Sequence, residues 1–280
     1  MNELQAKQFE LLKAFVGVCE KHHLKYFLYG GTCIGAVRHK GFIPWDDDVD
    51  VCMPRPDFDK FIKLQKDFKD GYFIQTYKSD FNYSYLFAKV RDSNTTFIEK
   101  TFAHTNFNHG IYIDIFPLDG ITKKKGRTRG RGPKPYLMWF FWYFPYLGHQ
   151  WFPWKWKKLW LDIPATIVAL AFSPFIIGNW SPRLLELWAK HIPYDKATVI
   201  GTYHTMHFHH ETYPKEWFGE GVEGDFEGLK IKLPSMYDTY LTQVYGNYMQ
   251  LPPENKRYGH HYHNGVSTTV GYKEYIKKQK

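Results

Sequence analysis

The chain has 280 residues, 44% of them hydrophobic, and a formal net charge of +9. This length allows a sizeable core, which excludes a wholly disordered chain, and one domain with an insertion is the simplest organisation. Three cysteines (Cys19, Cys33 and Cys52) have no paired spacing, so a disulfide framework is excluded and reduced thiols in a cytosolic setting are favoured.

The first elements alternate between helix and strand. Residues 1–23 carry charges throughout and predict an amphipathic helix, not a signal peptide. Residues 25–31 predict a short strand that ends in a glycine pair, and Thr32 is placed to cap the helix after it. The alternation in residues 48–53 ("DVDVCM") predicts a strand, and residues 54–68 predict a helix.

Further strands and helices complete the pattern. Strands are predicted in "GYFIQTYK" (71–78), "YLFAKVRD" (85–92), "TFIEK" (96–100) and "GIYIDIFPLDG" (110–120), the last closed by Pro117 and a turn. Beyond the middle of the chain we expect a helix in 182–192, a strand in 225–234, and a helix in 235–249 capped by Ser235. We therefore predict a sheet flanked by helices, an α/β or α+β fold.

The composition changes abruptly in residues 123–180. Lysine and arginine crowd residues 123–134, and aromatic, apolar segments interrupted by Pro145, Pro164 and Pro174 follow. None reaches the roughly 20 uninterrupted apolar residues of a spanning helix, but tryptophan and tyrosine beside basic residues are typical of a membrane interface. We predict an interfacial insertion between a catalytic core (1–122) and a C-terminal part (181–280); an extra hydrophobic layer on the core is the alternative.

Aspartates crowd the strand at residues 46–50. Asp48 and Asp50 would share one strand face about 7 Å apart. In "IYIDIF", the isoleucines share the buried face, which leaves Asp114 on the other. Three carboxylates on neighbouring strand ends are hard oxygen ligands, so we predict a site for Mg²⁺ or Mn²⁺. Asp46 and Asp47 are interpreted as turn residues.

Glycines and basic residues nearby suit a phosphate ligand. Gly30 and Gly31 let backbone N–H groups approach a ligand, at the start of a helix. Lys89 and Arg91 alternate on one strand face and could clamp phosphates. Arg38 and its neighbours His39 and Lys40 could neutralise the aspartates or meet the same ligand.

The segment "GGTCIGAVRHKGFIPWDDDVDVCMPRPDF" closely resembles the signature of the LicD family, which includes bacterial phosphocholine transferases and the fukutin-related proteins. "FAKVRDSNTTFIE", "GIYIDIFPLDG" and "YGNYMQLPPENKRYGHH" are similar to its further motifs, in order. The resemblance implies a nucleotidyltransferase-type mixed sheet, with donor phosphates at Gly30, Gly31 and Thr32. It also implies metal, in the form of two ions, at Asp48, Asp50 and Asp114.

The family's usual bacterial reaction moves phosphocholine from CDP-choline to a hydroxyl of a surface-glycan precursor and releases CMP. Its C-terminal motif makes His260 or His261 a possible active-site residue. Trp45 is a candidate aromatic face for a quaternary ammonium, although a core role is the simpler interpretation. The histidine tracts lack cysteine partners and a clear ligand spacing, which argues against zinc.

The resemblance leaves several readings open. The donor is CDP-choline or another CDP-alcohol, and the acceptor is a lipid-linked or surface glycan. We expect a cytoplasmic protein attached peripherally to the inner leaflet, with no nucleic-acid partner. The alternatives are a nucleotidyltransferase that releases pyrophosphate, and a non-catalytic, membrane-bound glycan-binding protein.

Overall fold

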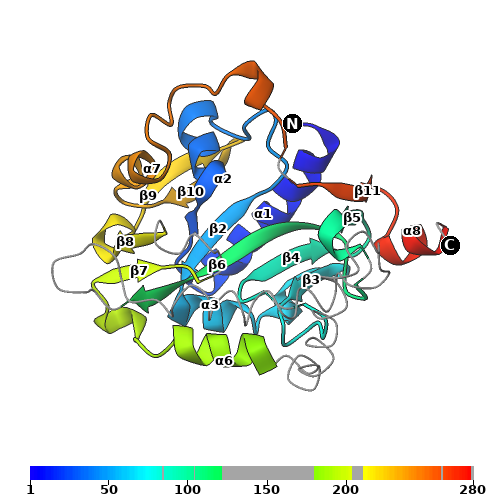
Figure 1. Ribbon diagram of the computed structural model, residues 1–280, viewed down its shortest axis with the longest axis horizontal. Helices are drawn as coiled ribbons and strands as arrows, with labels where there is room; N and C mark the ends of the chain where they lie inside the picture. The colour runs from blue at the N-terminus through cyan, green and yellow to red at the C-terminus, as the bar shows by residue number, and fades with distance from the viewer. Residues whose placement is uncertain (84, 104, 122–179, 204–210, 260, 279–280) are drawn as a thin grey trace, which may run out of the picture.

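The computed structural model describes residues 1–83, 85–103, 105–121, 180–203, 211–259 and 261–278 (Figure 1). These residues form a mixed sheet with helices around it, which confirms the predicted α+β class. The predicted insertion, apart from Trp180, lies outside the described residues. Within the described ranges, no helix combines the length and the apolar character needed to cross a bilayer.

Seven of the described strands form the main sheet. The strands run in the spatial order β1 (Phe27–Leu28), β2 (Asp50–Pro54), β6 (Ile111–Ile121), β4 (Ala88–Asp92) and β3 (Tyr72–Gln75), while β7 (Val199–Gly201) pairs with the end of β6 and β8 (Thr212–Pro214) pairs with β7. The β2–β6 pair is parallel and the other pairs are antiparallel. The chain after the insertion therefore adds strands to the same sheet as the chain before it.

Two smaller antiparallel pairs accompany this sheet. They are β9 (Val222–Phe226) with β10 (Leu229–Leu233), and β5 (Thr96–Glu99) with β11 (His263–Ser267). Because β11 lies beside β5, the last part of the chain returns to the region of β4 and β6 (Figure 1).

Helices surround the sheet, and α7 and α8 lie at opposite ends of the molecule (Figure 1). The α-helices are α1 (Glu3–Lys21), α2 (Gly30–Ile34), α3 (Arg55–Phe61), α6 (Trp180–Ala189), α7 (Tyr237–Tyr245) and α8 (Tyr272–Lys278). A π-helical turn (Gly35–His39) continues α2, and 3-10 turns span Gln65–Asp67, Lys100–Phe102, Tyr194–Lys196, Lys215–Trp217 and Glu254–Lys256. Helix α1 begins with a capping box between Asn2 and Gln5, which satisfies its first backbone donors.

The core lies between α1 and the sheet. Leu11 and Phe15 of α1, Val51 of β2 and Ile113 of β6 are all fully buried. All eleven residues of β6 are buried, as expected for the central strand of a covered sheet.

A buried ion pair fastens the chain on both sides of the insertion. Arg55 of α3 donates two hydrogen bonds of 2.6 Å to the carboxylate of Asp119, near the end of β6. Glu186 of α6 lies 3.9 Å from the same guanidinium. The first helix after the insertion is thereby tied to the strand before it.

The local predictions for Thr32, Pro117 and Ser235 were wrong. Helix α2 begins at Gly30, so Thr32 lies inside it and does not cap it. Strand β6 continues through Pro117 to Ile121. Pro117 falls between the last β4 pairing at Ile115 and the first β7 pairing at Asp119, so that edge of β6 requires no amide donor there.

The third wrong prediction concerns α7, whose cap is Met236. The hydroxyl of Ser235 instead donates to the carbonyl of Phe218 and accepts from the amide of Gly221. It fixes the turn before the β9–β10 hairpin.

Candidate functional site

A row of polar side chains crosses the buried sheet. The strand register pairs Asp50 of β2 with Asp114 of β6, Asp114 with Lys89 of β4, and Lys89 with Gln75 of β3. Cross-strand partners project from the same face of a sheet. Asp114 and Lys89 are 5% and 2% exposed, so the row places opposite charges together in a nearly dry environment.

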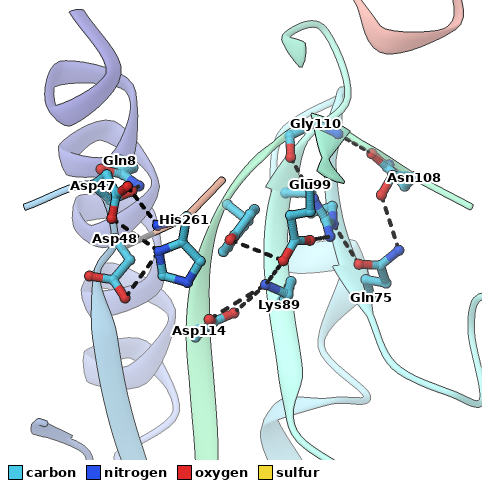
Figure 2. A network of polar contacts seen from close by, with 12 residues as sticks. Gln8, Asp47, Asp48, Gln75, Lys89, Glu99, Asn108, Gly110, Asp114 and His261 are labelled. Atoms are coloured by element: carbon cyan, nitrogen blue, oxygen red, sulfur yellow. Dashed lines mark hydrogen bonds and ion pairs between the residues drawn. The ribbon is translucent and has the colours of Figure 1, made fainter. Parts of the chain in front are cut away.

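The loop before β2 adds further carboxylates. Asp48 precedes the strand, which begins at Asp50, so the predicted strand started two residues too early. The side chain of His261 reaches this loop: its Nδ1 lies 3.0 Å from Asp47 Oδ1 and 3.7 Å from Asp48 Oδ2 (Figure 2). The backbone amide of His261 also donates to Asp47.

The carboxylates of this site are crowded enough to disfavour ionisation. Burial, and then the nearby Asp48, raise the pKa of Asp46 to about 8. Burial and the charges of Asp48 and Asp114 raise the pKa of Asp50 well above its ordinary value. Burial likewise raises the pKa of Asp114, although Lys89 opposes this. The positive charge beside these acids is too small to keep all of them ionised at neutral pH.

His261 supplies part of the missing charge. Burial disfavours its charged form, but the hydrogen bond with Asp47 and the charge of Asp48 raise its pKa to about 9. Ligand atoms of Asp47, Asp48 and His261 all lie within 4.8 Å of one another. Clustered carboxylate oxygens are a donor set that fits a hard divalent cation, and these residues could hold one.

Lys89 and Arg91 both form ion pairs with Glu99. Lys89 Nζ lies 3.1 Å from Asp114 Oδ1 and 3.5 Å from Glu99 Oε1, and Arg91 Nη2 lies 3.2 Å from Glu99 Oε2 (Figure 2). Both cations also stack on Tyr112. These charges, with burial opposing them, lower the pKa of Glu99 to about 2.

The prediction that Arg91 clamps phosphate requires correction. Its side chain is 0% exposed, and its nitrogens donate to Gln75, to Glu99 and to the carbonyl of Gly110. Arg91 can be fully buried because its ion pair with Glu99 and its contact with the ring of Tyr112 compensate the loss of hydration. Lys89, beside Asp114, is the basic residue that borders the acids.

The glycine pair makes room for carboxylates. Gly30 has a φ of +54°, and a Cβ on it would lie 3.1 Å from Asp50 Oδ2 and 3.4 Å from the hydroxyl of Tyr245. A Cβ on Gly31 would lie 3.1 Å from Asp46 Oδ2. The amide of Gly30 donates to the hydroxyl of Tyr240, so it is not the free phosphate donor that we expected.

Thr32 and Asp50 are joined directly. The hydroxyl of Thr32 accepts a 2.8 Å hydrogen bond from the amide of Asp50. Thr32 is 3% exposed and therefore fixes the start of β2 against α2.

The remaining predicted site residues are Arg38, His39, Trp45 and His260. Arg38 donates to the carbonyls of Tyr248 and Gln250, which pins that loop over α2. Trp45 packs partly buried against the core, with the ring of His39 at 6.4 Å and the guanidinium of Arg257 at 5.4 Å. His260 lies outside the described residues.

Sequence reasoning missed several residues of this site. Glu99 lies two residues after Phe97 in a predicted strand, and that spacing could have placed the two side chains on the same face. The contact between Asp47 and His261 joins residues 214 apart, and the contact between Gly30 and Tyr240 joins residues 210 apart. No local pattern signals such pairs.

Comparison with known proteins is consistent with this geometry. Residues 23–158 match the family described as LicD/FKTN/FKRP, nucleotidyltransferase domain. The chain is similar to the lipopolysaccharide cholinephosphotransferase LicD of Haemophilus influenzae, with 29% identity over 279 residues, which cover 93% of this chain and 96% of the relative. It is also similar to the ribitol 5-phosphate transferase FKRP of Mus musculus and of Homo sapiens, with 48% identity over 42 residues, 15% of this chain and 8% of each relative.

We expect Gly30→Ala to lose affinity for Mn²⁺ as well as stability. The positive φ alone should cost about 1–2 kcal/mol, and the added methyl would also displace the Asp50 carboxylate. Gly228→Ala is the matched control, since Gly228 has a φ of +79° and no atom lies within 4 Å of the place that its added methyl would take. Calorimetric titration with Mn²⁺ should show a loss only in Gly30→Ala; equal Mn²⁺ affinities in the two variants would contradict this account.

The stability of the metal-free protein should fall as pH rises from 6.5 to 8.5. Asp46 has a pKa of about 8 against an ordinary 3.8, and His261 about 9 against 6.5. In this range the folded state holds protons that the unfolded state has released, so each rise in pH favours unfolding. His109 and Glu99, whose pKa values are lowered to about 4 and about 2, change charge mainly below this range.

A divalent cation should replace those protons. We therefore expect Mg²⁺ or Mn²⁺ to raise the Tm more at pH 8.5 than at pH 6.5, measured by thermal unfolding against EDTA. Sodium chloride at equal ionic strength is the control. An equal rise at both pH values would show that the crowded acids are not the cation site.

Proposed function

Because the chain belongs to the LicD family, we propose that it moves phosphocholine, or a similar alcohol phosphate, from a CDP-alcohol to a hydroxyl of a cell-surface glycan precursor, with release of CMP. The observation that carries the proposal is the adjacent placement of Asp50, Asp114 and Lys89 on one buried sheet face. The two kinds of named transferase among the relatives, for cholinephosphate and for ribitol 5-phosphate, both move an alcohol phosphate.

The carboxylates would hold the metal. In this proposal Asp48, Asp50 and Asp114, with Asp46 beside them, hold two ions of Mg²⁺ or Mn²⁺. Bound metal would offset the negative charge of the diphosphate and of the departing CMP. The raised pKa values of Asp46, Asp50 and Asp114 support this, because such acids ionise fully only when a cation is present.

In this proposal Asp114 also takes the proton of the attacking hydroxyl. It shares the sheet face of Asp50, beside the proposed metal, and its carboxylate would act as the general base. Lys89, 3.1 Å away, keeps a positive charge beside it. Glu99 and Arg91 would position Lys89 from below, so that its ammonium group stays near the reacting phosphate.

The competing reaction is nucleotidyl transfer. The same carboxylates would serve it, but the released product would be pyrophosphate and not CMP. Incubation with Mg²⁺ and a panel of CDP-alcohols, with and without acceptor, distinguishes the two by the product. A non-catalytic glycan-binding protein would release neither.

Asp48→Asn, Asp50→Asn and Asp114→Asn should each lower CMP release by about 1,000-fold or more, because residues of one metal site act as a unit. For the same reason the triple variant should be about as inactive as each single one. Asp70→Asn, at an exposed position, is the control and should keep full activity. Circular dichroism would verify folding. Near-normal CMP release by folded Asp50→Asn would refute the mechanism.

We also propose that residues 123–180 attach the protein to the inner leaflet. The proposal is supported by the basic run at 123–134 beside tryptophan-rich sequence. Each base near an anionic surface contributes about 1 kcal/mol.

Anionic vesicles of phosphatidylglycerol and phosphatidylcholine should therefore sediment the protein, and salt should weaken binding. Replacing Lys123, Lys124, Lys125 and Arg127 by serine should lower the affinity for these vesicles by a factor of about ten or more, because each of the four bases is expected to contribute roughly 1 kcal/mol. The control variant replaces four exposed lysines elsewhere: Lys63, Lys66, Lys230 and Lys277. If both variants lose affinity equally, general charge and not this segment binds the vesicle.

A further inference from the structure

A cavity of about 610 Å³ lies between the ends of β3 and β4 and the start of α8. Six of its lining residues carry the argument, namely Phe73, Asp80, Ser93, Asn94, Asn108 and Tyr272. None of them belongs to the row of acids that forms the candidate active site. Gln75, which contacts the lining residues Asp80 and Asn108, lies two strand spacings from Asp114 and three from Asp50, so the cavity wall begins about 10 Å from Asp114 and about 14 Å from Asp50.

Hydrogen bonds fix the inner wall of this cavity. The amide of Asn108 donates to Asp80 Oδ2 over 2.9 Å, and its side-chain nitrogen donates to Ser93 Oγ over 2.8 Å. Its side-chain oxygen accepts from Gly110. Since Asn108 is only 6% exposed, the wall is a built polar surface and not a chance gap between loops.

The same wall is joined to the active site. Gln75 donates to Asp80 and to the carbonyl of Asn108, and accepts from Arg91. Arg91 contacts Glu99, and Glu99 contacts Lys89, the neighbour of Asp114. Figure 2 shows this path from Asn108 through Gln75 and Glu99 to Asp114. A ligand in the cavity would rest on side chains that also position Lys89.

The lining suits a neutral, hydroxyl-rich ligand with one apolar face. The carboxylate of Asp80 accepts hydrogen bonds, and the amide of Asn94 and the hydroxyl of Ser93 can both accept and donate them. The rings of Tyr272 and Phe73 offer flat apolar surface. The charged lining residues are Asp80, Glu274 and Lys273, with a net charge of −1. This charge disfavours a phosphate or a nucleotide.

We propose that this cavity is a carbohydrate-binding subsite, which holds a sugar of the acceptor glycan away from the point of transfer. Its role toward an acceptor rests on the proposed function, whereas sugar binding by the cavity does not. The reach of about 10 Å from the cavity wall to Asp114 implies an oligosaccharide acceptor, with one sugar in the cavity and another beside Asp114.

Saturation-transfer NMR tests the site directly, with maltotriose, lactose and N,N′-diacetylchitobiose as probes. We expect at least one sugar to receive saturation from the wild-type protein. Tyr272→Ala and Asn94→Ala should each weaken that binding at least about fivefold. Tyr272→Phe, which keeps the ring, should retain it, and so should Asp48→Asn, which alters only the acidic site.

Several results would overturn the proposal. One is that none of the three sugars receives saturation, and another is that folded Tyr272→Ala and Asn94→Ala bind sugar as tightly as the wild-type protein. The others are loss of sugar binding in Asp48→Asn, and binding of choline in place of the sugars. The proposed function fails separately, if the wild-type protein releases no CMP from any CDP-alcohol. Sugar binding that survives this failure would still assign the cavity to carbohydrate.

Discussion

The parallel register that sets Asp50 beside Asp114 is the constraint on which the rest of the site depends. Two carboxylates on adjacent buried strands repel each other and lose hydration, and both have raised pKa values. The surrounding residues reduce this cost, because the glycine at position 30 leaves space for Asp50 and Lys89 forms an ion pair with Asp114. Carboxylates in this arrangement are a donor set that fits a divalent cation.

The cations near these acids are themselves held by an acid. Glu99 contacts both Lys89 and Arg91, and its low pKa means that it stays ionised at every physiological pH. Breaking one member of such a buried set leaves another charge uncompensated, which is costly. Glu99 therefore restricts where Lys89 can point, and it couples the position of Lys89 to Arg91 and Gln75 further along the sheet.

Sequence patterns were informative wherever a strand face decides the outcome. Alternation placed Asp114 opposite the buried isoleucines, and the spacing of hydrophobic residues predicted a sheet flanked by helices. Patterns failed where a side chain has two possible partners: the hydroxyl of Thr32 was expected to cap a helix but binds the amide of Asp50. They also failed for Arg91, because a charged residue on a strand is buried only when distant residues, here Glu99, compensate it. The partnership of Asp47 with His261 depends entirely on how the chain folds back.

The chain before residue 122 and the chain after residue 179 meet at the same end of β6. The described part of β6 ends at Ile121, seven residues beyond Asp114, which corresponds to about 23 Å along the strand. The chain returns in α6, which Arg55 ties to the end of β6 through Asp119 and Glu186, and β7 then pairs with β6 again. The excursion therefore starts and ends at the far end of the central strand. Changes in that sequence therefore need not alter the register of Asp50 and Asp114.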